Sequence, residues 1–259
     1  MPTVDANGET LSYVRAGSGQ PLVLVHSLGT ASWLWAAQID YWSKHFDVIA
    51  FDVRGHGASS RNGPVSMRNV AADLRAALPL LGVTLAHFIG ISMGGLILAR
   101  LHELEPALFR SMVIADSFHT QGEAGHQRLA MLNEKLTGLS MPDYGRIYAD
   151  ETILPATSRD IHARLAESIG KTGKDGYLET IVSIFTEDVS APLRMIKVPV
   201  LVVAGEKDNR TPPALSEAIA GLVEGAEYRV IPAAAHLANL DNPAGFHAAI
   251  DPFLEARRA

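Results

Sequence analysis

Ser92 is the residue whose type and position best suit covalent chemistry. It lies in the sequence Gly-Ile-Ser-Met-Gly-Gly, residues 90–95, directly after a β-branched run that predicts a strand over 87–91. The apolar stretch 96–104 predicts a helix on the other side. A sharp turn between strand and helix would strain the serine backbone and expose its hydroxyl, while glycines keep side chains clear of the bend. The pattern therefore predicts a nucleophilic serine.

A serine hydroxyl is a weak nucleophile unless a base accepts its proton, and that base needs an orienting group. Of the ten histidines, His236 is the best base, because it follows the last predicted strand, 228–232, and precedes a helix that begins near Pro243. Loops at strand ends are where catalytic side chains gather in α/β sheets. Taken alone, His236 could equally be a surface loop residue.

Asp208 is the first choice for the orienting carboxylate. It follows the predicted strand 198–205, and the sequence Thr-Pro-Pro at 211–213 then fixes a loop and starts a helix. Two alternatives stay open, namely the neighbouring Glu206 and, as the runner-up, Asp116 at the end of the preceding predicted strand.

An oxyanion would need backbone N–H donors close to the serine. The N–H of Met93, at the start of the predicted helix, is the natural first donor. The second should come from the turn that follows the predicted strand 22–26, with Leu28 N–H as first choice and Ser27 N–H as second. His26 is interpreted as a structural residue that orients this turn.

Parallel strands in a sheet covered by helices would position these residues. Short runs rich in Val, Ile and Leu alternate with helix-like segments such as 67–81 and 216–223, which is typical of parallel strands buried on both faces. The predicted strands are 22–26, 48–52, 87–91, 112–116, 198–205 and 228–232.

The strand rhythm stops after residue 116 and resumes near 193. We expect a core α/β domain in two parts, 1–116 and 193–259, with a helical lid at 117–192, because ordinary connections are far shorter. Residues expected to contact substrate are Ser27, Trp33, Phe118, Met131, Leu132, Tyr144 and Leu237, with Leu136 as a further lid residue. Lid cations that could hold an acidic substrate are Arg128, Lys135, Arg146 and Arg164.

Composition excludes several classes of partner. The chain has 259 residues, a formal net charge of −6 without basic runs, and no cysteine, so we expect neither nucleic-acid binding nor thiolate chemistry. Its apolar runs are too short for a membrane span, and residues 1–19 do not resemble a secretory signal, which favours a cytoplasmic protein. No metal-binding pattern appears, so we expect no metal and no cofactor. Whether the chain forms a homo-oligomer stays open.

Together these elements resemble the α/β-hydrolase superfamily over nearly the whole chain, with nucleophile, acid and base in that family's usual order. The stretch 52–59 is similar to the family's segment after its fourth strand, which implies structural roles for Arg54 and His56. Residues 26–30, 90–96, 174–177 and 236–240 most resemble the 3-oxoadipate enol-lactonases of aromatic catabolism. All three tryptophans lie outside the predicted lid, unlike in those enzymes, and His26 stands where they often have asparagine.

The resemblance implies a mostly parallel central sheet flanked by helices, and a serine esterase or lactonase that forms an acyl-enzyme on a small ester or lactone. A cofactor-free perhydrolase or haloperoxidase-like activity would use the same three residues. C–C bond hydrolases usually carry tryptophan after the catalytic histidine, where this chain has Leu237, and serine at 92 excludes the chemistry of relatives with an aspartate nucleophile. Outside enzymes, the alternative is a ligand-binding receptor on the same fold.

Overall fold

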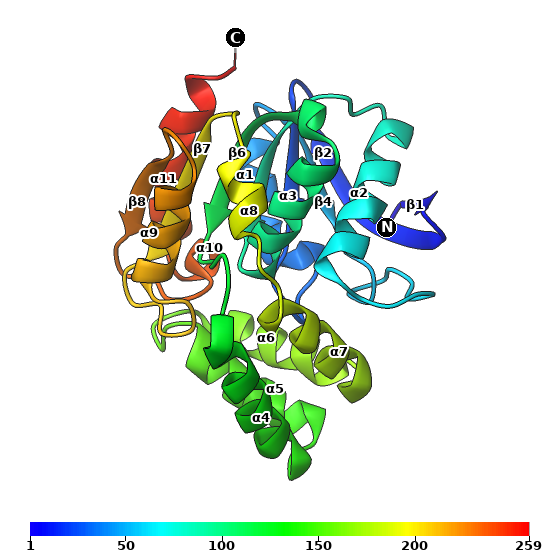
Figure 1. Ribbon diagram of the computed structural model, residues 1–259, viewed down its shortest axis with the longest axis vertical. Coiled ribbons are helices and arrows are strands. Elements are labelled where there is room, and N and C mark those ends of the chain that lie inside the picture. Colours follow the sequence, from blue (N-terminus) through cyan, green and yellow to red (C-terminus); the bar gives the residue numbers. More distant parts are fainter. Residues whose placement is uncertain (259) are drawn as a thin grey trace.

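The computed structural model describes residues 1–258, which contain one eight-stranded sheet in the order β1-β2-β4-β3-β5-β6-β7-β8 (Figure 1). The first three strands in this order pair antiparallel, and every other neighbouring pair is parallel. This confirms the predicted α/β sheet. The strands are β1 (Thr3–Ala6), β2 (Glu9–Gly17), β3 (Pro21–Val25), β4 (Asp47–Phe51), β5 (Ala86–Ile91), β6 (Phe109–Ala115), β7 (Val200–Gly205) and β8 (Glu227–Ile231).

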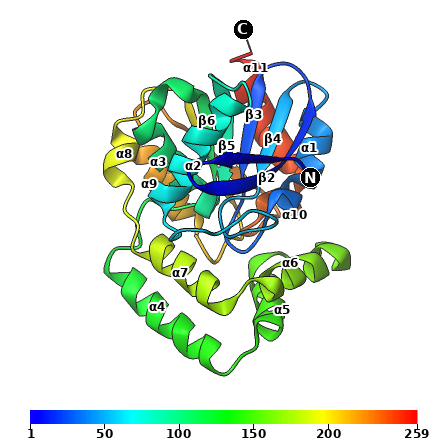
Figure 2. The ribbon, with the colours of Figure 1, turned by 90° about the vertical axis from the view of Figure 1, so that its right-hand side faces the viewer.

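Helices cover both faces of the sheet, with α2, α3, α8 and α9 on one side and α1 and α11 on the other (Figure 2). The core helices are α1 (Ala36–Trp42), α2 (Met67–Leu80), α3 (Met93–Leu104), α8 (Ser190–Arg194), α9 (Pro213–Leu222), α10 (Ala238–Asp241) and α11 (Pro243–Glu255), and the short 3-10 turns are η1 (Ser32–Trp35) and η2 (Pro106–Leu108). Among residues 1–258, no helix combines the length and apolar character needed to cross a membrane.

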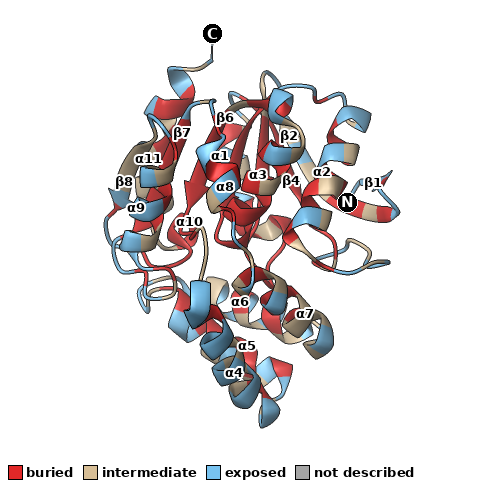
Figure 3. Ribbon diagram, in the orientation of Figure 1, coloured by how far each residue is buried: buried red, intermediate tan, exposed pale blue. Residues whose placement is uncertain are grey.

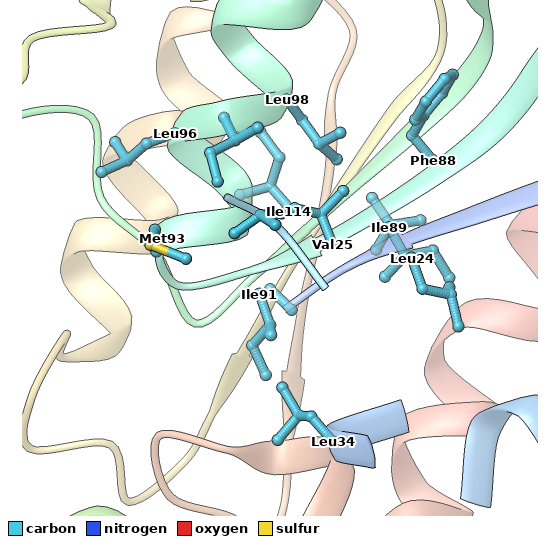
Figure 4. Close-up of a cluster of buried hydrophobic side chains, with 14 of the residues drawn as sticks. Leu24, Val25, Leu34, Phe88, Ile89, Ile91, Met93, Leu96, Leu98 and Ile114 are labelled. Carbon is cyan, nitrogen blue, oxygen red and sulfur yellow. The ribbon is translucent and has the colours of Figure 1, made fainter. Parts of the chain in front are cut away.

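The core lies between the inner strands and these helices, where the strands are buried along all or nearly all of their length (Figure 3). Val25, Ile91 and Ile114 come from three neighbouring strands and pack with Leu96 and Leu98 of α3 (Figure 4). This packing fixes the strand-to-helix turn at Ser92 against the sheet. The edge strand β8 is only partly buried, as expected for a strand with one neighbour.

The N-terminal hairpin is the part of the sheet that the sequence analysis did not predict. β1 is the edge strand, while β2 pairs with β1 through its first half and with β4 through its second half. Both strands include exposed or partly buried residues, so they lack the continuous apolar run of a central strand. Asn7 and Gly8 form the connecting turn, and both have positive φ angles, 52° and 80°. Asn-Gly is the strongest short signal for a two-residue hairpin turn, and it could have revealed this element.

Four helices lie together beyond the carboxyl ends of the strands (Figures 1 and 2). The segments that lead into and out of this group pair through an antiparallel bridge between Thr120 and Asp188, and Val189 N–H donates to His119 O at 2.9 Å. We retain the predicted lid, 117–192, as a proposal for the unit that these helices form. They are α4 (Gly122–Thr137), α5 (Met141–Thr152), α6 (Arg159–Lys171) and α7 (Lys174–Phe185).

Candidate active site

Ser92 lies at the turn between β5 and α3, with φ 54° and ψ −116°. This left-handed backbone is costly for a residue with a side chain, so its surroundings must hold it in place. Ser92 N–H donates to Ala115 O at 2.8 Å, and the Ser117 hydroxyl donates to Ser92 O at 2.8 Å. Both contacts tie the strained residue to the adjacent strand β6 and the segment that follows it.

The glycines on either side of Ser92 allow the backbones to approach closely. A Cβ atom on Gly90 would lie 2.5 Å from Gly94 O, and one on Gly94 would lie 2.3 Å from Val25 O. Neither distance is compatible with a side chain, so the sequence pattern reflects contact between β3, β5 and α3.

A chain of hydrogen bonds connects Ser92, His236 and Asp208. His236 Nε2 lies 3.0 Å from Ser92 Oγ, and His236 Nδ1 lies 2.9 Å from Asp208 Oδ2. With the Nδ1 proton donated to the carboxylate, Nε2 is free to accept the serine proton. The three residues are 9%, 4% and 2% exposed, so the relay is shielded but reaches the surface at the serine.

Asp208 is held by its own loop. One carboxylate oxygen accepts the backbone N–H groups of Arg210 and Thr211 at 2.8 and 2.9 Å, and the other accepts the Thr211 hydroxyl at 2.7 Å. Burial raises the pKa of Asp208, but His236 and the Thr211 hydrogen bonds lower it more, so the pKa lies below its ordinary value. The acid is therefore ionised at neutral pH. Thr211 was not predicted as a site residue.

Asp116, the runner-up acid, has a different set of partners. Its carboxylate accepts Gly205 N–H at 2.6 Å and Ala238 N–H at 3.2 Å, which connects the end of β7 with the loop that carries His236. Burial and the nearby Asp208 raise the pKa of Asp116 well above its ordinary value. Glu206 instead accepts Ala233 N–H at 3.1 Å. The geometry thus places Asp208, and neither alternative, against the imidazole.

The two predicted oxyanion donors lie near the serine. Met93 N–H is the first amide of α3, and the first amides of a helix have no partner within it. Leu28 lines the same cavity as Ser92. Its loop is held by His26, whose Nε2 accepts Val53 N–H at 3.1 Å and whose Nδ1 lies 2.7 Å from Ser27 O. This arrangement requires a neutral His26, and burial lowers its pKa accordingly.

His56 packs against His26, with 5.1 Å between ring centroids. Its burial makes a testable prediction about how the stability of the protein depends on pH. Burial, with a smaller contribution from His26, lowers the pKa of His56 to about 3. The unfolded chain binds a proton near pH 6.5 while the folded protein does not, so stability is lost as pH falls below that value. We expect His56→Gln to reduce the loss of unfolding free energy between pH 8 and pH 5 by about 2 kcal/mol.

Urea unfolding at the two pH values measures this difference. His45→Gln, at an exposed histidine, is the matched control and should leave the pH dependence unchanged. Equal pH dependence in the His56→Gln variant and the unmodified protein would contradict the assignment of a neutral, buried imidazole.

A cavity of about 520 Å³ opens above Ser92 and His236, between the sheet domain and helices α4, α5 and α7. Four of the predicted contact residues line it, namely Phe118, Met131, Leu132 and Tyr144. The cavity also has lining residues that the sequence analysis missed: Gln121, Tyr148, Glu151, Tyr177, Ile181, Ile184, Phe185, Asn209, Arg210 and Thr211. Among residues 1–258, no group of three histidine or carboxylate side chains is arranged to hold a metal ion.

The other predicted contact residues lie outside this lining. Trp33 donates to Ser168 Oγ at 3.2 Å and packs under Arg164, so its ring is used to join η1 to α6. Leu237 and Leu136 are fully buried in the core, and the Ser27 hydroxyl is buried too. Tertiary packing, which residue spacing alone does not define, leaves these side chains outside the cavity lining.

Two of the four predicted lid cations, Arg128 and Lys135, line the cavity. Arg146 instead forms an ion pair with Asp143 on the same helix, and Arg164 lies over the Trp33 ring. The cation that the sequence analysis missed is Arg210, which comes from the acid loop and not from the lid.

A mostly parallel sheet covered by helices on both faces, with a strained serine at a strand–helix turn that is hydrogen-bonded through a histidine to an aspartate, is the arrangement typical of α/β hydrolases. The chain belongs to the alpha/beta hydrolase fold family, whose model matches residues 20–243.

Its relatives include 3-oxoadipate enol-lactonase 2 of Acinetobacter baylyi, which is 30% identical over 98% of this chain and 96% of its own length. The enol-lactonase of Burkholderia xenovorans LB400 superposes with a TM-score of 0.80 at 26% identity, over 98% of this chain and all of its own. A hydrolase of Pseudomonas aeruginosa PA01 superposes with a TM-score of 0.88 at 29% identity, over 98% and 97% of the two chains.

Proposed function

We propose that the protein hydrolyses small carboxylic esters or lactones through an acyl-enzyme on Ser92. The observation that carries this proposal is the relay of 3.0 and 2.9 Å from Ser92 through His236 to Asp208, at the floor of a cavity. The similarity to enol-lactonases favours a lactone among the possible substrates. A small-molecule substrate suits a cavity of about 520 Å³, which is within the usual range for such ligands.

In the proposed reaction, Ser92 Oγ bonds to the substrate carbonyl carbon while His236 Nε2 takes the serine proton. The carbonyl oxygen gains the negative charge and is stabilised by the N–H groups of Met93 and Leu28. His236 then gives its proton to the leaving oxygen as the carbonyl–oxygen bond breaks. Asp208 stays ionised and stabilises the imidazolium throughout.

Water completes the cycle. It attacks the acyl carbon as His236 takes one of its protons, and the serine oxygen leaves with that proton. In a lactone the leaving oxygen stays attached to the acyl chain, so one ring-opened acid is released. An enol-lactone would release an enol, which converts to the more stable ketone, and this conversion makes the opening irreversible.

Labelling with a fluorophosphonate tests the proposal directly. An activated serine forms a stable adduct, so peptide mass spectrometry should place one adduct on Ser92, and the Ser92→Ala variant should not be labelled. A panel of lactones, p-nitrophenyl esters and peroxide then separates lactonase, esterase and perhydrolase activity. An unreactive Ser92 in folded protein would reject the hydrolase proposal and favour a ligand-binding receptor.

A further inference from the structure

The Arg210 side chain is a cation in the cavity whose donors are mostly unused. Its guanidinium lies 4.1 Å from the centre of the Tyr148 ring, and one terminal nitrogen lies 3.4 Å from Glu151 Oε2. Its Nε is buried and has no hydrogen-bond partner among residues 1–258. The side chain is 27% exposed, so the terminal nitrogens are the part that an incoming molecule can reach.

The carboxylate that Arg210 does contact is shared with another cation. Glu151 Oε1 lies 2.7 Å from Lys135 Nζ, which is much closer than the contact to Arg210. Glu151 is itself half-exposed, and surface ion pairs of this kind contribute little. Arg210 therefore lacks the close, bidentate carboxylate that a partly buried guanidinium prefers.

The charged side chains that line the cavity are mostly positive. Arg128, Lys135 and Arg210 line it, against the single carboxylate of Glu151, although the chain as a whole carries a net charge of −6. A cavity with excess positive charge in an acidic protein attracts anions and repels cations.

We propose that Arg210 is a specificity-determining residue that binds a carboxylate carried by the substrate, so that the preferred esters and lactones are anionic. The inference rests on the proposed function, because it assigns the charge class of the substrate for the same site. The planar guanidinium would donate two parallel hydrogen bonds to the carboxylate, while Glu151 keeps its closer partner, Lys135.

A purely structural role for Arg210 predicts a different behaviour. Arg210 belongs to the acid loop and Tyr148 to α5, so their stacking could simply join the lid to the sheet domain. Loss of such a support would affect all substrates alike. Loss of a carboxylate site would affect only anionic ones.

The experiment compares two esters of equal shape, mono-4-nitrophenyl glutarate and the 4-nitrophenyl ester of glutaric acid monoamide. We expect the unmodified protein to prefer the anionic ester, and Arg210→Met to lower kcat/KM for it by about 10- to 100-fold, mainly through KM. The amide ester should change by less than about 3-fold. Arg210→Lys, which keeps the charge without the planar donors, should lie between, and Arg146→Met, at an exposed lid cation, should change neither.

Equal losses on both esters, or no preference in the unmodified protein, would overturn the proposal. A binding measurement separates it from the proposed function. Glutarate should raise the Tm of the unmodified protein and of Arg146→Met, but not that of Arg210→Met. If this holds while neither ester is cleaved, the carboxylate site stands and the hydrolase proposal fails. If glutarate has no effect on the unmodified protein, the carboxylate site is rejected.

Discussion

Ser92→Ala should lower kcat for ester or lactone hydrolysis by about 100,000-fold while KM changes by less than about 3-fold. The serine oxygen forms the bond to substrate, so its loss removes the whole acyl-enzyme route and leaves only what the cavity and the oxyanion donors provide to attack by water. Alanine meets the same positive φ as serine, and the contact that it removes is the hydrogen bond to His236 Nε2, so the protein should still fold. Stopped assays with the best substrate of the panel measure the residual rate.

The same prediction extends to the relay as a unit. If Ser92 and His236 act together, the double variant Ser92→Ala/His236→Ala should be no slower than either single variant within about 10-fold. Losses that multiply in the double variant would show that the two side chains contribute independently. The 3.0 Å contact between them would then not serve the proposed proton transfer from Ser92 to His236. Thermal unfolding of each variant is the control for folding.

The fold could be predicted because its inner strands are continuous runs of apolar residues. Runs such as 22–25 and 200–204 are apolar on both faces, and only a sheet covered on both sides buries such runs. The hairpin β1–β2 was missed for the opposite reason, since many of its residues are exposed or only partly buried and its sequence is not continuously apolar. Only the Asn7-Gly8 turn marks them.

The three relay residues could be predicted because each lies in the turn or loop after a strand, and the carboxyl ends of parallel strands meet at one edge. The choice between Asp208 and Asp116 could only be ranked, since both follow neighbouring strands. Loop geometry decides it: a Cβ on Gly205 would lie 2.2 Å from Ala235 O, so the acid and histidine loops touch there. That contact brings Asp208 against His236.

The cavity lining was the least predictable part. The residues of α5 and α7 that face it, such as Tyr148 and Tyr177, are aromatic side chains that periodicity assigns equally well to lid packing. Arg210 was missed because its position two residues after Asp208 does not indicate that its side chain lines the cavity, and only the structure shows this. Which side chains of a helix or loop face the cavity depends on tertiary packing and not on residue spacing alone.

Replacing Asp208 and Asp116, one at a time, with asparagine should distinguish a catalytic role from a role in stability. In Asp208→Asn, the amide would no longer stabilise the imidazolium and would favour the wrong tautomer of His236, so kcat should fall by about 10,000-fold with little loss of stability. Asp116→Asn keeps one acceptor but turns an N–H donor toward Gly205 or Ala238, so unfolding free energy should fall by about 1 to 3 kcal/mol.

Activity of the folded Asp116→Asn protein should stay within about 10-fold of the unmodified protein, because its carboxylate positions two loops without contacting the imidazole. Kinetics and urea unfolding of both variants under one set of conditions measure the contrast. The reverse pattern, in which Asp116→Asn abolishes turnover while Asp208→Asn remains active, would assign the acid to β6. The proposed relay would then need a rearranged histidine loop, because the 2.9 Å contact of His236 is with Asp208.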